Sequence, residues 1–135
     1  MRNATIRRAT KGSWCRQVRI PDTVESQEVA RAAVRDCVRH RTMGDVAALR
    51  GTLIAAGLAA DIHHAHAGPA VLTVRWREYR RHGGVLSLTL DKPAASAWSM
   101  PELTELTLDL MATDWAAATG EHTCRVDARV EDPAA

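Results

Sequence analysis

Two runs of alternating apolar and polar residues occupy the middle of the chain, on either side of a glycine pair. The apolar positions of these runs are Leu72, Val74, Trp76, Leu86, Leu88 and Leu90. A period of two residues is typical of a strand with one buried face. Gly83 and Gly84 can adopt the positive φ angles that a turn requires. The pattern therefore predicts a β-hairpin over residues 70–90.

Three further segments have strand-like patterns. Residues 14–20 and 123–130 alternate apolar and polar side chains over the length of an ordinary strand. The segment 61–67 alternates less regularly, and the Gly-Pro pair that follows it would turn the chain back onto the hairpin. We expect 61–67 to be the first strand of a three-strand antiparallel meander with the hairpin.

Two adjoining segments repeat apolar residues at helical spacing. The first helix is expected to begin near Ser26, with an apolar face of Val29, Ala33, Val34, Cys37 and Val38. The second is expected to begin at Asp45 and to end near Gly57. Its expected buried face is Val46, Leu49, Leu53 and Ile54. A short loop between them makes the pair a helical hairpin.

A third helix is predicted after the β-hairpin. Ser99 can cap it, Pro101 suits its first turn, and Glu102 completes a capping box with Ser99. The apolar positions that we expect to face the core are Leu103, Leu106, Leu110 and Met111. Glu102, Glu105 and Asp109 would form an acidic outer face, and Gly120 would end the helix.

These segments together predict an α+β fold, with an antiparallel sheet of four to five strands and about three helices packed on one face. A length of 135 residues fits one domain. We expect a mobile basic arm over residues 1–13, a single α+β domain over 14–131 and a frayed tail over 132–135.

One stretch resembles a known family. Between Val29 and Leu49, a helix is followed by Gly44-Asp45 and a second helix, which is similar to the opening of NTF2-like domains. The resemblance implies a cone-shaped α+β fold, often with a ligand pocket. The long third helix and the lack of phenylalanine depart from that family, and no functional residue is carried over.

Composition narrows the class of protein. Arginine greatly outnumbers lysine and alanine is abundant, which suggests a GC-rich bacterial genome. No apolar run is long enough to span a membrane, and the basic start of the chain lacks the apolar core of a secretory signal. The three cysteines are far apart and odd in number, which favours reduced thiols in the cytoplasm.

Charge is unevenly distributed although the net charge is only +2. Residues 1–50 carry eleven Arg or Lys against five Asp or Glu, and residues 93–135 carry two against eight. Such asymmetry fits a basic surface for an acidic partner. It fits equally well an attraction between the two ends of the chain within the fold, which is the commoner reason in a chain of nearly neutral charge.

Histidines cluster near the centre of the chain. The candidate metal ligands are His63, His64, His66 and His82. Neutral imidazoles bind transition metals such as zinc, but zinc needs about four ligands in tetrahedral geometry. We favour the alternative, in which these side chains are simply solvated, and we expect no cofactor.

Arginines are the second candidate group. Arg75 and Arg77 on the hairpin, with Arg125 and Arg129 on the last strand, would lie on the outer face of the sheet. They could bind a protein partner, or they could be solvated or paired with acidic residues across strands. A nucleic acid is possible but not favoured, because only Tyr79 offers a base-stacking ring near that face.

Catalytic motifs are absent, since the chain has no GxSxG, P-loop or GxGxxG sequence. We therefore expect a small cytosolic binding or regulatory protein, without catalysis, that acts through protein–protein contacts or self-association. The alternatives are a small enzyme or ligand-binding domain with a pocket between sheet and helices, and a metal protein that uses the histidines. The sequence alone leaves enzymatic activity undecided.

Overall fold

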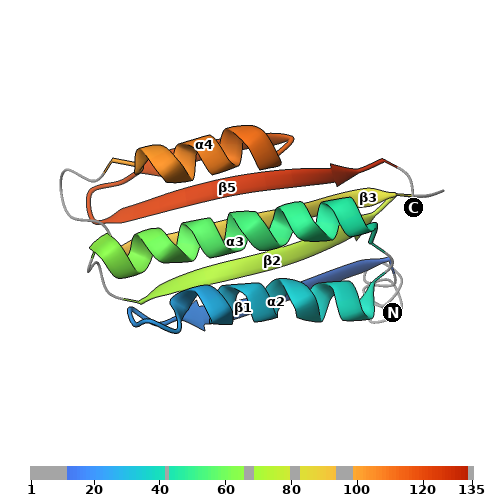
Figure 1. The fold of residues 1–135 in the computed structure, drawn as a ribbon, viewed down its shortest axis with the longest axis horizontal. Helices are drawn as coiled ribbons and strands as arrows, with labels where there is room; N and C mark the ends of the chain where they lie inside the picture. Colours follow the sequence, from blue (N-terminus) through green and yellow to red (C-terminus); the bar gives the residue numbers. More distant parts are fainter. Residues whose placement is uncertain (1–11, 42, 66–68, 80–82, 94–98, 134–135) are drawn as a thin grey trace, which may run out of the picture.

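The computed structural model describes residues 12–41, 43–65, 69–79, 83–93 and 99–133. Within these residues the chain forms a five-strand antiparallel sheet, and three helices cover one face of it (Figure 1). The elements are β1 (Ser13–Ile20), α2 (Ser26–His40), α3 (Asp45–Ala65), β2 (Ala70–Glu78), β3 (Gly84–Pro93), α4 (Glu102–Met111), β4 (Asp114–Thr119) and β5 (Thr123–Asp132). The predicted α+β class is confirmed.

The sheet is built around the predicted hairpin. Strands β2 and β3 pair in the expected register, with Val74 opposite Leu88 and Trp76 opposite Leu86. The strand order is β1-β2-β3-β5-β4, so β3 lies at the centre, and β1 and β4 form the two edges. In β2, β3 and β5, every second side chain points toward the helices and is buried there.

The core lies between this inner sheet face and the helix layer. From the sheet it receives bulky side chains, among them Leu72, Trp76 and Leu88. From the helices it receives mostly small ones: Ala30, Ala33, Ala47, Ala55 and Ala59. Large residues on the sheet and small residues on the helices let the two layers approach closely.

Gly51 marks the closest approach of α3 to the sheet. A Cβ atom built on it would overlap Cδ2 of Leu86, a fully buried side chain of β3. Gly57, two turns further along α3, has room for a Cβ, since the nearest atom is Cγ2 of Thr107 at 3.7 Å. Packing against the sheet therefore requires a glycine at Gly51 but not at Gly57.

The predicted strand at 61–67 is wrong. Residues 61–65 are the last turn of α3, and 66 and 67 lie outside the described residues. The second helix therefore does not end near Gly57. Its alanine-rich sequence strongly favours helix, and a single glycine costs only about 1 kcal/mol inside one. The third strand beside the hairpin is β1 on one side and β5 on the other.

The predicted buried face of the second helix is also mostly wrong. Ile54 is buried, but Val46, Leu49 and Leu53 are 63%, 60% and 42% exposed. The inner face of α3 is instead formed by Ala47, Gly51, Ile54, Ala55, Leu58 and Ala59. The sheet already supplies bulky side chains, so the small face of the helix packs inward and the bulky stripe faces outward.

The third helix differs from the prediction in length and orientation. It ends at Met111, and residues 114–119 form the edge strand β4, so Gly120 does not end the helix. Its N-cap is Pro101 without a side-chain capping bond, so the predicted capping box is absent. Leu108 faces the core, whereas Leu103, Leu106 and Leu110 are exposed. Strand β4 forms because β5 offers a free edge, to which Ala117 pairs opposite Val126.

The two glycines of α3 give a matched test of this packing. We expect Gly51→Ala to lower the free energy of unfolding by about 1–3 kcal/mol, the usual cost of overpacking a core. Gly57→Ala should raise it by about 0.5–1 kcal/mol, because alanine favours helix and no atom obstructs it. Urea denaturation measures both. A stabilising Gly51→Ala would contradict the close approach of α3 to β3.

Candidate interaction surface

The outer face of the sheet, which the helices leave uncovered, carries all four predicted arginines. Arg75 and Arg77 lie on β2 and alternate with the buried Val74 and Trp76. Arg125 and Arg129 lie on β5 and are exposed in the same way. The ladder places Arg75 and Arg129 in one row with Ser87 of β3 between them. Two strand spacings separate them, about 10 Å.

The two arginines of β5 are paired with carboxylates. Nε of Arg125 donates to Oδ1 of Asp91 at 2.7 Å, and its Nη2 donates to Oδ2 at 3.3 Å. This hydrogen bonding and the charge of Asp91 raise the pKa of Arg125. Nη1 of Arg129 lies 3.4 Å from Oδ2 of Asp114, and Nη2 lies 3.9 Å from Oε1 of Glu131. The cross-strand pairing considered from the sequence thus occurs on β5.

The two arginines of β2 differ from them. Both are exposed, and within the described residues neither side chain makes an ion pair or hydrogen bond. Arg75 lies between two hollows. One, of about 440 Å³, includes Trp14, Cys15 and Arg77 in its lining, and the other, of about 250 Å³, includes Gln17, Thr73 and Asp127. An acidic group that binds these guanidinium groups therefore breaks no pair among the described residues.

A ligand pocket between sheet and helices finds no support in the described residues. The described residues line hollows of about 440, 430, 340 and 250 Å³, and each of these is lined by residues of one layer. The hollows of about 440 and 250 Å³ are lined by the sheet and the residue before it, and those of about 430 and 340 Å³ by the helices and the start of α2. Between the layers lie the side chains of the core.

The histidine hypothesis is not tested. The backbone of His63 and His64 belongs to the last turn of α3, whereas His66 and His82 lie outside the described residues. Among the side chains that the structure describes, no three His, Cys, Asp or Glu residues gather where they could hold a metal ion. A metal site at His63, His64, His66 and His82 stays a prediction from the sequence.

The cysteines are free thiols in two environments. Cys37 and Cys124 are buried, whereas Cys15 is exposed on the edge strand β1. Burial raises the pKa of the Cys37 thiol to about 12. The thiol therefore stays protonated at neutral pH and is a poor nucleophile. Since the unfolded thiol ionises near pH 9, its burial contributes stability at neutral pH that is lost as the pH rises above 9.

Thiol labelling checks this assignment. With a chromogenic disulfide at pH 8, we expect one of the three thiols, Cys15, to react at least about 100 times faster than the other two, which must wait for local or global opening. Cys15→Ser should remove the fast phase. A fast phase that persists in this variant would show that a buried cysteine is accessible.

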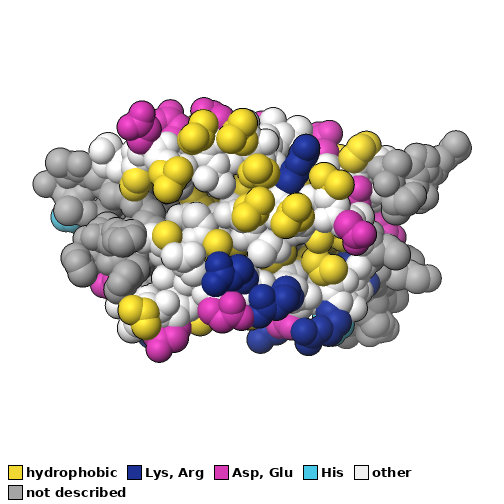
Figure 2. Space-filling model, viewed as in Figure 1, with side chains coloured by type: hydrophobic (Ala, Val, Ile, Leu, Met, Phe, Trp, Pro, Cys, Tyr) yellow, Lys and Arg dark blue, Asp and Glu magenta, His cyan; other side chains and the backbone are white. Residues whose placement is uncertain are grey.

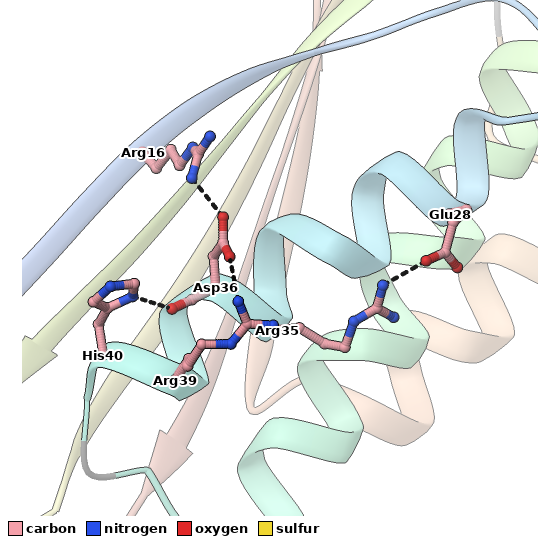
Figure 3. A network of polar contacts seen from close by, with 6 residues as sticks. All are labelled: Arg16, Glu28, Arg35, Asp36, Arg39 and His40. Atoms are coloured by element: carbon pink, nitrogen blue, oxygen red, sulfur yellow. Dashed lines mark hydrogen bonds and ion pairs between the residues drawn. The ribbon is translucent and has the colours of Figure 1, made fainter.

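Helix α2 carries a row of arginines, Arg31, Arg35 and Arg39, but much of their charge is already paired (Figure 3). Glu28 accepts from both Arg31 and Arg35. Asp36 pairs with Arg39 and with Arg16, which reaches it from β1. The Arg16–Asp36 pair joins the helix to edge strand β1, and the other pairs lie within the helix. They leave three arginines against two carboxylates on α2, so the helix is weakly basic.

Sequence reasoning missed the exposed apolar residues of the helix layer. We call six of these residues the leucine face: Val46, Leu49 and Leu53 of α3, and Leu103, Leu106 and Leu110 of α4. Helical periodicity identified all six, but it could not show which side of each helix packs inward. None of the described helices is long and apolar enough to cross a membrane.

The comparisons with known proteins identify the fold alone. No family model matches the chain, and no curated protein matches its sequence. The resemblance of residues 29–49 to NTF2-like domains thus gains no support. Among solved structures, the chain is similar to one in the SiaB–SiaC complex from Pseudomonas aeruginosa, with a TM-score of 0.65 and 11% identity. The match covers 96% of this chain and 97% of the other.

Proposed function

We propose that this chain is a cytoplasmic regulatory protein that acts without catalysis, by binding an acidic protein partner on the outer face of its sheet. Arg75 and Arg77 are the main contacts in this proposal. The observation that carries it is the contrast between the two strands. Arg125 and Arg129 are neutralised by Asp91, Asp114 and Glu131, whereas Arg75 and Arg77 are exposed and have no described partner.

Two further observations support the proposal. A solved structure with a similar fold comes from a complex between two proteins, so this fold is compatible with binding a protein partner. In addition, the exposed arginines lie beside edge strand β1, and no other described strand than β2 pairs with it, so its second side offers backbone groups to a partner strand. Arginine is enriched at protein interfaces because its planar group binds carboxylates in pairs of hydrogen bonds.

Charge reversal on β2 tests the proposal. The wild-type chain, immobilised, is exposed to an extract of the organism that encodes it, and captured proteins are identified by mass spectrometry. We expect Arg75→Glu with Arg77→Glu to weaken capture of acidic partners at least about tenfold, since each lost interface pair costs about 1–3 kcal/mol. The melting temperature should stay within about 2 °C of the wild type, because both side chains are exposed.

Arg31→Glu is the matched control. It reverses the charge of one arginine, half the change made by the double variant, in the helix layer on the other face of the molecule. The control should capture the same partners as the wild type. If the double variant of β2 also retains them, the proposed surface is wrong. Capture that nuclease treatment abolishes would favour a nucleic acid instead.

A further inference from the structure

The hydrogen bonds of edge strand β1 show which of its backbone groups point away from the sheet. The N–H of Glu78 on β2 donates to the carbonyl of Gly12, just before β1, at 2.8 Å. In an antiparallel pair, every second residue forms hydrogen bonds with the neighbouring strand, and the residues between point away from it. With the observed register, the even-numbered residues of β1 therefore bond β2. The N–H and C=O groups of Cys15, Gln17 and Arg19 point outward.

These outward groups form a free stretch of sheet edge. Among the described residues, no hydrogen bond is made by the N–H or C=O group of Cys15, Gln17 or Arg19 outside the ladder. The carbonyl of Ser13 accepts from Nη2 of Arg41 at 2.8 Å, as expected for a carbonyl that faces away from β2. The edge from Cys15 to Arg19 can therefore pair with an added strand of ordinary length.

The side chains beside this edge favour an acidic strand. On the outer face, Cys15 lies opposite Arg75, and Ser13 lies opposite Arg77. Because both edge residues are small, the long arginine side chains can extend over them toward a strand added beyond β1, whose backbone would lie about 10 Å from β2. The hollow of about 440 Å³ that these four residues help to line opens at this place. Arg19 is exposed on the same face and makes no ion pair among the described residues.

The opposite side of an added strand would lie against α2. Arg16 of β1 pairs with Asp36, so the flank of α2 that carries Asp36 faces the edge strand (Figure 3). Val29 and Ala32, seven and four residues before Asp36, lie on the same flank and are half-buried. Small or apolar side chains of an added strand would pack against this flank.

The other edge of the sheet does not suit an acidic strand. Beside β4 lies α4, which carries Glu102 and Glu105 in its first turn, and its Asp109 accepts from the indole N–H of Trp115 on β4. Figure 2 shows acidic side chains gathered along the outer side of this helix. The same view shows the arginines along α2 beside acidic side chains. At the edge formed by β1, an acidic strand instead meets arginines without described partners.

We propose that the acidic partner binds as an extended segment that adds a strand to the sheet beside β1. The added strand is antiparallel to β1, like the described strand pairs of this sheet. Its backbone forms hydrogen bonds with Cys15, Gln17 and Arg19. Its acidic residues alternate along the outer face and contact Arg75 and Arg77, and the residues between them face α2. This inference rests on the proposed function and specifies how the partner is recognised, with backbone bonds for affinity and alternate side chains for specificity.

A peptide tests the added strand. The probe is capped Val-Glu-Val-Glu-Val-Glu-Val, and NMR titration measures its binding, which we expect to saturate below about 1 mM. Gln17→Pro should weaken binding at least about tenfold, because proline lacks the outward N–H and its ring obstructs the added strand. The fold should tolerate this change, with an unchanged circular dichroism spectrum, since an edge strand accepts proline where the N–H faces solvent.

Ala117→Pro is the matched control on the other edge. The N–H of Gly120 donates to the carbonyl of Thr123 at 2.7 Å, so the N–H of Ala117, three residues earlier, points away from β5. This variant should bind the peptide as the wild type does. Equal binding by Gln17→Pro and Ala117→Pro would overturn the added strand on β1.

Hydrogen exchange of single amides tests the bonding directly in the wild-type chain. Without peptide, we expect the amides of Cys15, Gln17 and Arg19 to exchange at least about 100 times faster than those of Arg16 and Val18, which bond β2. Saturating peptide should slow exchange in the first set at least about fivefold and leave the second set unchanged. If the peptide binds but the first set is not slowed, the proposal is wrong.

The arginine variant separates this inference from the proposed function. If Arg75→Glu with Arg77→Glu abolishes peptide binding but Gln17→Pro does not, the basic surface is right and the added strand is wrong. If only Gln17→Pro abolishes binding, the acidic contacts are wrong, and the proposed function fails with them. A peptide that does not bind overturns the added strand, whereas partner capture that depends on Arg75 and Arg77 would still uphold the proposed function.

Discussion

The close contact between α3 and the central strand β3 determines the rest of the structure. Leu86 and Leu88 of β3 project toward the helix, and Gly51 gives Leu86 the space it occupies. A bulkier helix face could not lie there without moving the sheet away. The small face of α3 therefore packs inward. Its bulky stripe, which has no room in the core, is left on the surface.

This constraint explains which parts of the fold could be predicted from the sequence. The strands β2, β3 and β5 alternate strictly, and alternation alone states which residues face the core. The prediction for α3 failed because both of its faces are apolar. Alanines and a glycine on one side compete with leucines on the other, and periodicity favours the bulkier set. The choice depends on the volume already supplied by the sheet, which is a property of the assembled layers.

The candidate interaction surface, too, could be predicted from the sequence only in part. Position on the outer sheet face followed from alternation, so the sequence correctly placed Arg75, Arg77, Arg125 and Arg129 together. It could not separate paired arginines from unpaired ones. That distinction depends on the neighbours across the ladder, such as Asp91 opposite Arg125 and Asp114 opposite Arg129. Strand order, which local pattern does not encode, brings these neighbours together.

The molecule thus presents two different surfaces on opposite sides: a charged sheet face and an apolar helix face. The apolar helix face depends on α3 packing with its small side inward, whereas the charged sheet face follows from the alternation of β2 and β5. The most direct test is the unfolding free energy of Leu49→Ala compared with Leu88→Ala. We expect a loss below about 1 kcal/mol at Leu49 and of about 2–5 kcal/mol at Leu88. Equal losses at both positions would mean that Leu49 is buried, and the account would be wrong.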